Sequence, residues 1–298
     1  PWVRRVHALG RGTFDTLALA ARLRRERYEL AVDFFGNPRS ALLSALSGAR
    51  ITAGYEMRGR RHLYRLRVPR EVSPGPGRRE YAAAVHRRLA LAVGGRDDGL
   101  APRLEPPPSA RAAGASLLER AGVRDPRRAI GLVATAIGWP SKTWPPSLNA
   151  RYARTLIERG REVVLIPGPG EEAGNRWIVE RVPGISMLPP CGLLDLLGAI
   201  EALGAVTGID SGPRHLAAAV GTPSYTWIGP THADTWTLPD PRHAVWRTPL
   251  PCGACDRTRC PHWSCLPTLE PRAMAARVLA HLEACDERAA DLGPAARA

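Results

Sequence analysis

The sequence predicts an α/β protein with two domains, each built on a parallel sheet. Short strands with near-continuous apolar runs alternate with helices, which is typical of parallel sheets covered on both faces. The 298 residues are enough for two domains of ordinary size. The proline-rich stretch at 100–108 indicates an extended connection. We expect domains at 1–122 and 123–298, with the C-terminal helix packing back on the first.

The spacing of apolar residues places the individual elements. In the first half it predicts a strand at 28–33 and helices at 18–27, 40–46 and 79–93. In the second half it predicts strands at 129–134, 162–166, 185–188, 205–209 and 224–228, with helices at 149–158, 171–181, 193–203 and 213–220. Ligands of such sheets bind outside the carboxyl ends of the strands, so the loops that follow the strands are the candidate sites.

The composition indicates a globular protein with an anionic partner. No apolar run reaches the ~18 residues of a membrane span, and no secretory signal follows the first charges. The formal charge of +14 suits a nucleic acid, an anionic lipid or a phosphorylated glycan. A coding bias toward Arg, Ala and Pro is the alternative explanation. The chain starts without Met, so we expect a fragment.

One loop carries the only lysine of the chain. Lys142 lies in the segment Thr135–Pro146, directly after a predicted strand, whereas all other strong cations are arginines. A compact ammonium suits a task that a planar guanidinium performs badly. Together with the small hydroxyl side chain of Thr135, this loop suits a phosphate. The alternative is a surface loop with a solvated lysine.

The loop after the next strand, Ile166–Glu172, is rich in glycine and ends in two glutamates. Glycines allow close backbone approach, and a carboxylate at the start of a helix can accept hydrogen bonds from ribose hydroxyls. We therefore assign the ribose to Glu171. The alternative is that Glu171 and Glu172 only complement the dipole of the following helix.

A third loop, within Gly208–Pro223, is the most specific. A strand leads into Asp210, Ser211 and Gly212, and a proline then opens a helix at a position that tolerates it. The free N–H groups of the first helical turn form an anion site, and His215 lies in that turn. The alternative is that Asp210 or Ser211 is only an N-cap and that His215 is a packed histidine.

These segments together resemble the motifs of the bacterial heptosyltransferases, family nine of the glycosyltransferases. Residues 207–223 with Gly229-Pro230-Thr231 resemble the donor-site signature, 142–145 the Lys-x-Trp-Pro segment, and 168–171 the glycine-rich segment ending in Glu. Residues 33–40 are similar to the family's Asp-x-Gln-Gly-x-x-(Arg/Lys)-Ser loop, with Phe35 where Gln is usual. The resemblance covers roughly residues 28–283.

The resemblance implies a GT-B fold, in which two Rossmann-like domains face each other across a cleft and the second binds the nucleotide sugar. It implies an inverting, metal-independent transfer from ADP-heptose or a related nucleotide sugar, with no cofactor. Lys142 and Thr135 would hold the phosphates, Glu171 the ribose, and four further residues would complete the donor pocket: Asp210, Ser211, Gly212 and His215. Lys142 and Asp210 are the predicted catalytic residues.

The general base is where the sequence departs from the family. The family places an Asp in a glycine-rich loop after the first strand, and no such loop precedes Trp2. Asp15 has no apolar strand before it, and Asp33 matches the acceptor-side loop. We therefore nominate no base, and we expect a first domain that lacks its initial strand and loop and that binds nucleotide yet transfers sugar poorly.

The acceptor implied by the resemblance is the phosphorylated, anionic lipopolysaccharide core. The candidate acceptor-binding residues are Asp33, Asn37, Arg39 and Arg60, in or near loops of the basic first half. For each arginine, a solvated surface position is the alternative. The implied location is the cytoplasm, with peripheral contact to the inner membrane. The sequence leaves open the donor sugar, the acceptor position and the oligomeric state.

Four of the six cysteines fall in one stretch with the spacing Cys252-x2-Cys255-x4-Cys260-x4-Cys265. Four thiolates could hold a structural zinc, although the spacing is not that of a standard paired-knuckle site. Unpaired thiols and redox-labile pairs are the alternatives. We expect no metal in the catalytic site in either case.

Three other functions compete with this interpretation. Nucleic-acid binding fits the charge, but no recognised motif is present and aromatics are not interleaved with the arginines, so we expect no nucleic-acid partner. A GT-B transferase that uses another nucleotide sugar for a surface polysaccharide fits the motifs equally well. A non-catalytic nucleotide-binding relative also fits them.

Overall fold

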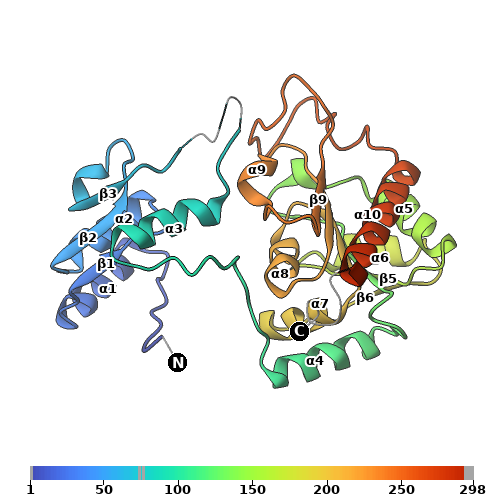
Figure 1. Ribbon diagram of the computed structural model, residues 1–298, viewed down its shortest axis with the longest axis horizontal. Helices are drawn as coiled ribbons and strands as arrows, with labels where there is room; N and C mark the ends of the chain where they lie inside the picture. Colours follow the sequence, from blue (N-terminus) through green and yellow to red (C-terminus); the bar gives the residue numbers. More distant parts are fainter. Residues whose placement is uncertain (1–2, 73–74, 76–77, 292–298) are drawn as a thin grey trace. The chain divides into compact units, whose positions relative to one another are not determined.

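The computed structural model describes residues 3–72, 75 and 78–291, and it divides the chain into two compact units (Figure 1). The first unit is Pro1–Leu100 and the second is Ala101–Ala298. Each contains a parallel sheet, as predicted. The division lies before the predicted boundary at 122/123 because α4 (Pro108–Arg120) packs against α7 (Leu193–Ala202) of the second unit. Among the described residues, no helix is both long and apolar enough to cross a membrane.

The first unit contains a three-stranded sheet in the order β1-β2-β3: β1 (Leu30–Val32), β2 (Ile51–Tyr55) and β3 (Leu66–Val68). Its helices are α1 (Thr13–Arg25), α2 (Pro38–Leu46) and α3 (Ala82–Ala92), with a 3₁₀ turn η1 (Arg61–Leu63). Helix α3 covers β2 and β3, and the small core beneath it consists of Ala53, Tyr55, Val68 and Leu89. The predicted strand and three helices are present, whereas β2 and β3 were not predicted.

The second unit contains a six-stranded parallel sheet in the order β6-β5-β4-β7-β8-β9. The strands are β4 (Ile130–Val133), β5 (Val163–Leu165), β6 (Ile185–Met187), β7 (Ala205–Ile209), β8 (Ser224–Trp227) and β9 (His243–Trp246). The helices besides α4 and α7 are α5 (Pro146–Glu158), α6 (Glu172–Val179), α8 (Gly212–Val220), α9 (Ala233–Trp236) and α10 (Pro271–Asp291), with a 3₁₀ turn η2 (Pro140–Lys142). All five predicted strands are present. The strand order reverses between β4 and β7.

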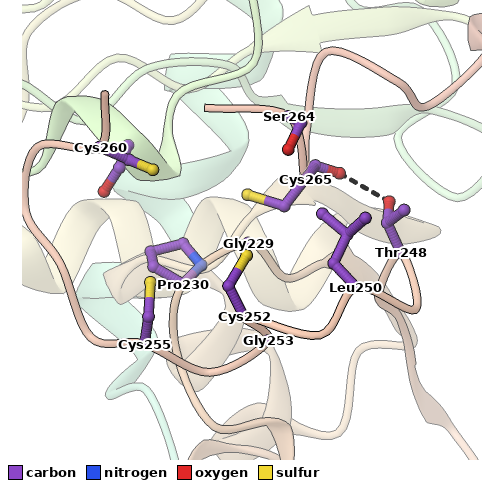
Figure 2. A pocket seen from close by; sticks show the side chains of 11 residues that line it. Gly229, Pro230, Thr248, Leu250, Cys252, Gly253, Cys255, Cys260, Ser264 and Cys265 are labelled. Carbon is purple, nitrogen blue, oxygen red and sulfur yellow. Dashed lines mark hydrogen bonds between the residues drawn. The ribbon is translucent and has the colours of Figure 1, made fainter. Parts of the chain in front are cut away.

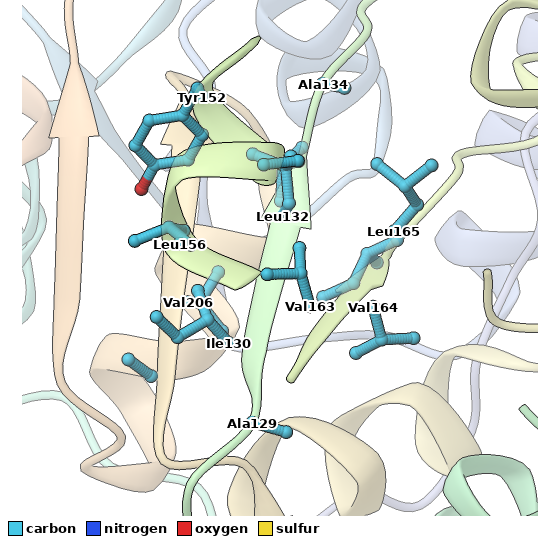
Figure 3. Packing of buried hydrophobic residues seen from close by; sticks show 14 of the residues in the cluster. Ala129, Ile130, Leu132, Ala134, Tyr152, Leu156, Val163, Val164, Leu165 and Val206 are labelled. Atoms are coloured by element: carbon cyan, nitrogen blue, oxygen red, sulfur yellow. The ribbon is translucent and has the colours of Figure 1, made fainter. Parts of the chain in front are cut away.

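The core of the second unit lies between this sheet and its helices (Figure 3). Strand β4 is buried over its whole length, as a central strand of a parallel sheet should be. Helix α10 packs against α5 and contributes buried side chains to this core. The expected packing of the C-terminal helix on the first domain stays a prediction. The close approach of helices α4 and α7 requires a glycine at position 114. A Cβ there would lie 2.2 Å from the backbone nitrogen of Ala199.

Candidate functional site

A cavity of about 500 Å³ opens at the carboxyl edge of the second sheet. It is lined by the segments that follow four neighbouring strands, β4, β5, β6 and β7, on both sides of the point where the strand order reverses. This is where doubly wound sheets bind ligands. The lining residues are Val133, Thr135, Ile166, Pro167, Gly168, Pro169, Glu171, Glu172, Leu188, Pro189, Pro190, Cys191, Leu193, Leu196, Ser211, Gly212, Pro213 and Leu216.

Thr135 and Glu171 form the polar wall of this cavity. The Thr135 hydroxyl donates to Oε2 of Glu171 over 2.8 Å, and the backbone nitrogens of Gly168 and Ile137 donate to the same carboxylate over 2.9 and 3.1 Å. The buried Asn175 amide donates to Thr135 Oγ1 over 2.9 Å. Glu171 therefore bridges the loops after β4 and β5, which is more than the dipole role that the sequence also allowed.

The start of α8 presents unused hydrogen-bonding groups to the cavity. Ser211 occupies the N-cap position with an extended backbone, yet its side chain makes no cap hydrogen bond. Its hydroxyl oxygen is shielded from solvent and has no hydrogen-bond partner within the described part of the chain. Outside its chain neighbours and its own helix backbone, no heavy atom lies within 4 Å of the position that a Cβ on Gly212 would take. A helix N-terminus with open space before it is suited to an anion.

Asp210, directly before Ser211, is buried between two cations. Lys142 Nζ lies 3.0 Å from Asp210 Oδ2, and Arg214 Nη1 lies 2.8 Å from Oδ1. The Thr231 hydroxyl donates to Oδ2 over 2.6 Å. The Lys142 ammonium also lies 4.4 Å from the centroid of the Trp139 ring. Two cationic side chains and one hydroxyl therefore hold the Asp210 carboxylate beside the N-terminus of α8.

The neighbouring charges keep the Asp210 carboxylate ionised. Burial alone would raise the pKa of Asp210, but the charges of Arg214 and Lys142, followed by the Thr231 hydrogen bond, lower it below its ordinary value. Desolvation, followed by the Arg214 charge, lowers the pKa of His215 to about 4. Asp210 is therefore a counter-ion and not a proton acceptor at neutral pH, and His215 is neutral there.

Buried side chains anchor the loop that carries Lys142 to the core of the second unit. Trp144, two residues further on, is fully buried, and its ring centroid lies 4.9 Å from that of Trp227. The buried Asn149 amide donates to the backbone oxygens of Ala134 and Trp144 over 3.2 and 2.9 Å, which closes the loop at both ends. The Lys-x-Trp-Pro pattern thus places a core anchor beside the only lysine.

The predicted acceptor residues all make hydrogen bonds within the first unit. Buried Asp33 accepts hydrogen bonds from the backbone of residues 35 and 36 and from the hydroxyls of Ser40 and Tyr64. Asn37 caps α2 by accepting from the Ser40 nitrogen. Arg39 donates to Thr16 and to the backbone oxygens of residues 10 and 12, and Arg60 donates to the backbone oxygen of residue 36.

The four clustered cysteines line one small cavity at the 252–265 segment (Figure 2). All four are free thiols: Cys252 and Cys255 are exposed, and Cys260 and Cys265 are half-buried. The other two cysteines lie elsewhere, Cys191 on the wall of the large cavity and Cys285 in α10. The structure therefore brings together in space what the sequence grouped by spacing.

The structure divides the predicted donor residues into two neighbouring sets. Thr135, Glu171, Ser211 and Gly212 line the cavity, whereas three others lie outside its lining: Lys142, Asp210 and His215. The two sets meet at the peptide between Asp210 and Ser211. Sequence reasoning missed the apolar wall after β6, which the rule on carboxyl ends of strands could have indicated. It also missed the two further Asp210 partners, Arg214 and Thr231.

A family model decides the relationship. The model of glycosyltransferase family 9 (heptosyltransferase) matches residues 16–264. The chain belongs to glycosyltransferase family 9. Its sequence is 25% identical over 264 residues to lipopolysaccharide heptosyltransferase 1 of Pseudomonas aeruginosa, covering 85% of this chain and 68% of that protein. It is 27% identical over 243 residues to lipooligosaccharide heptosyltransferase 2 of Haemophilus influenzae, covering 75% of this chain and 67% of that protein.

Solved structures show the fold of this glycosyltransferase family 9 enzyme. A family 9 glycosyltransferase from Veillonella parvula matches with a TM-score of 0.68 at 19% identity, covering 80% of this chain and 69% of the other. ADP-heptose LPS heptosyltransferase II of E. coli matches with a TM-score of 0.66 at 22% identity, covering 91% and 81%. E. coli heptosyltransferase WaaC with ADP matches with a TM-score of 0.65 at 18% identity, covering 90% and 77%. The predicted α/β fold of the GT-B class is confirmed.

Proposed function

We propose that this chain is a heptosyltransferase that moves heptose from ADP-heptose to the anionic inner core of lipopolysaccharide. The observation that carries the proposal is the 500 Å³ cavity where Thr135, Glu171, Ser211 and Gly212 converge, next to the Lys142–Asp210 pair. Related proteins of this family are named as lipopolysaccharide or lipooligosaccharide heptosyltransferases, and one was solved with ADP. In this proposal the second unit binds the donor and the first unit the acceptor.

The cavity suits the adenosine part of the donor. Its wall after β6 is apolar, with Leu188, Pro189 and Leu193, which fits a flat base. Glu171 stands on the opposite, polar wall after β5 and can accept from ribose hydroxyls. The Glu171 carboxylate accepts three hydrogen bonds, from Thr135, Ile137 and Gly168. It is therefore oriented before a ligand binds.

The diphosphate would lie across the start of α8. The unpartnered Ser211 hydroxyl and the open N-terminus of the helix supply donors, and Thr135 lines the same cavity. Lys142 is the candidate for stabilising charge that develops on the leaving group. Asp210 fixes its ammonium, which is 15% exposed, so that no side-chain reorganisation is needed when the charge develops.

The proposed step is a displacement at C1 of the heptose. An acceptor hydroxyl attacks C1, the bond from C1 to the β-phosphate oxygen breaks with its electron pair, and ADP departs. The proton of the attacking hydroxyl passes to a base that we do not assign. Neither carboxylate weighed for that role is free in the structure: Asp15 accepts from the backbone nitrogen of residue 12, and Asp33 accepts four hydrogen bonds.

The acceptor side of the proposal rests on charge. Arg39 and Arg60 are half-buried and already hold the 33–40 loop, so we propose that they shape the acceptor site. In this proposal the arginines around Arg39 and Arg60 contact the phosphate groups of the lipopolysaccharide core. This contact would take place at the cytoplasmic face of the inner membrane. Such contacts would weaken with salt.

Calorimetric titration of the chain tests the donor assignment. We expect ADP to bind with measurable heat, UDP to bind more weakly, and single-stranded DNA not to bind at the cavity. Glu171→Gln should weaken ADP more than inorganic pyrophosphate, because pyrophosphate has no ribose for the Glu171 carboxylate to contact. Equal affinity for ADP and UDP would favour a transferase with another nucleotide sugar. Binding of DNA that competes with ADP would contradict the proposal.

A further inference from the structure

The cysteine segment, residues 252–265, has the features of a metal-binding loop. Its four thiols line one cavity of about 20 Å³, which has room for a single atom and not for a cluster of several. In Figure 2 the sulfur atoms of Cys252, Cys255, Cys260 and Cys265 surround a common space. Nothing in the donor site accounts for this grouping of thiols.

The backbone of the segment supports the same interpretation. Ala254, Asp256 and Trp263 have φ values of 58°, 52° and 28°, in the left-handed region that non-glycine residues rarely adopt. Two of these residues flank Cys255, and the third donates its backbone N–H to Cys260 Sγ over 3.2 Å. Hydrogen bonds of this kind stabilise a thiolate, and strained backbone persists where its surroundings require it.

We propose that the segment binds one divalent metal ion such as Zn²⁺. The ligands would be the thiolates of Cys252, Cys255, Cys260 and Cys265. Four sulfur ligands around a single site favour zinc in tetrahedral geometry, and binding releases the thiol protons to solvent. In the described part of the chain no three candidate ligands are yet gathered closely enough to hold an ion. Binding therefore requires thiols to rotate about their Cα–Cβ bonds into the cavity that they already line.

The ion would fix the loops that hold the Lys142–Asp210 pair. On one side, the Trp139 ring nitrogen and the Ser141 hydroxyl donate to the backbone oxygen of Arg257. The Trp263 ring nitrogen donates back to the backbone oxygen of Ser141 over 3.3 Å. These contacts join the cysteine segment to the turn that ends at Lys142.

On the other side, the backbone nitrogen of Asp256 donates to the backbone oxygen of Pro230 over 2.8 Å. The next residue, Thr231, donates to Asp210. Both members of the Lys142–Asp210 pair therefore depend on loops bonded to the cysteine segment. Metal binding itself is independent of the proposed function, and only its effect on nucleotide affinity rests on that function.

Elemental analysis of the full chain, purified under reducing conditions, tests the proposal. We expect about one equivalent of zinc per chain, since one tetrahedral site takes one ion. The double variant Cys255→Ser with Cys260→Ser should lose it. The matched control is Cys285→Ser, which removes a cysteine outside both the segment and the large cavity and should retain the ion. Replacement by Co²⁺ should give the visible absorption of a tetrahedral thiolate site in the wild type and in the control only.

Two results would overturn the proposal without any variant. One is metal-free wild-type protein that takes up no Zn²⁺ or Co²⁺ while all four thiols react freely with an alkylating agent. The other is non-reduced protein whose mass shows disulfides among the four. A metal-loaded chain that fails to bind ADP would instead contradict the proposed function and leave the metal site standing. Loss of ADP affinity in the serine pair but not in the control would support the link to Lys142.

Discussion

Asp33 and Asp210 occupy matching places in the two units and have opposite surroundings. Each follows a parallel strand, each is 4% exposed, and each precedes a helix with proline in its first turn. Asp33 accepts four hydrogen bonds from neutral backbone and hydroxyl donors. Asp210 lies between the cations of Lys142 and Arg214. The same local pattern thus builds a closed polar loop in one unit and a charged site in the other.

The different surroundings of Asp33 and Asp210 indicate different roles for the two buried carboxylates. Hydroxyl donors can also accept, so the surroundings of Asp33 tolerate a neutral replacement. Ammonium and guanidinium groups have no acceptor, and a buried cation without a counter-ion is costly. We infer that Asp33 organises a loop, whereas Asp210 holds a charge in position for an anionic ligand.

The largest effect is expected for Asp210→Asn. The variant removes the carboxylate that Lys142 and Arg214 both contact, and breaking a buried ion pair from one side costs about 3–5 kcal/mol of unfolding free energy. Chemical denaturation followed by tryptophan fluorescence measures this, because Trp144 and Trp227 are buried in the same unit. Loss of less than about 1 kcal/mol, the value of an exposed pair, would contradict the assignment.

Lys142→Ala tests the functional half of the comparison. The protein should remain folded because Arg214 and Thr231 still contact Asp210. We expect a loss of about 2–4 kcal/mol of transition-state stabilisation in transfer from ADP-heptose, the usual scale for one electrostatic donor. Arg103→Ala, which removes an exposed cation of the same unit, is the control and should leave the rate unchanged. Near-normal turnover would remove Lys142 from the mechanism.

Asp33→Asn should have a smaller effect, confined to stability. The amide oxygen can keep the bonds from residues 35 and 36, and the amide nitrogen can donate to the hydroxyls of Ser40 and Tyr64 after they rotate. We expect a loss of about 1 kcal/mol of unfolding free energy and an unchanged ADP affinity. If ADP affinity falls as it does in the Lys142 variant, the contrast between the two carboxylates is wrong.

The smallest effect concerns pH. The pKa of His215 is lowered to about 4 in the free protein, so the ring is neutral at pH 7. A bound anion nearby would raise that pKa, and linkage then requires ADP affinity to increase as the pH falls through both pKa values, from about 6 toward 3. We expect a gain of about threefold, the scale of a partly exposed charge pair. Dividing the ADP affinity of the wild type by that of His215→Gln at each pH cancels the titration of ADP itself. A ratio that does not change with pH would exclude the effect.

The sequence predicted the second unit better than the first. Strands β4 to β8 are apolar runs between helices, and each was predicted within a few residues. Strands β2 and β3 escaped prediction because neither is a continuous apolar run: β3 has Arg67 at its centre, and β2 contains Thr52 and Gly54. Helix α4 was missed because prolines precede it, and its contact with α7 depends on close approach at Gly114, which no local pattern reveals.

The sequence was sufficient to predict which loops form the candidate site. The rule on carboxyl ends of strands placed Thr135, Glu171 and Ser211 on one edge, and they line one cavity, although their roles stay predictions. The sequence could not distinguish ligand-binding residues from loop-organising ones, since Asp, Asn and Arg serve both. Only the geometry shows that the predicted acceptor residues Asp33, Asn37, Arg39 and Arg60 hold segments of the first unit together.

The central claim is that the cavity before α8 binds the nucleotide, and a glycine variant tests it most directly. A Cβ at Gly212 would meet no heavy atom within 4 Å outside its chain neighbours and its own helix backbone, and Gly212 lines the cavity, so we expect a leucine there to occupy the cavity. Calorimetry with ADP on Gly212→Leu should show at least about a tenfold loss of affinity, 1.4 kcal/mol, relative to wild type. The control Ala115→Leu, on the exposed face of α4, should bind normally. Unchanged ADP affinity in a folded Gly212→Leu protein would contradict the account.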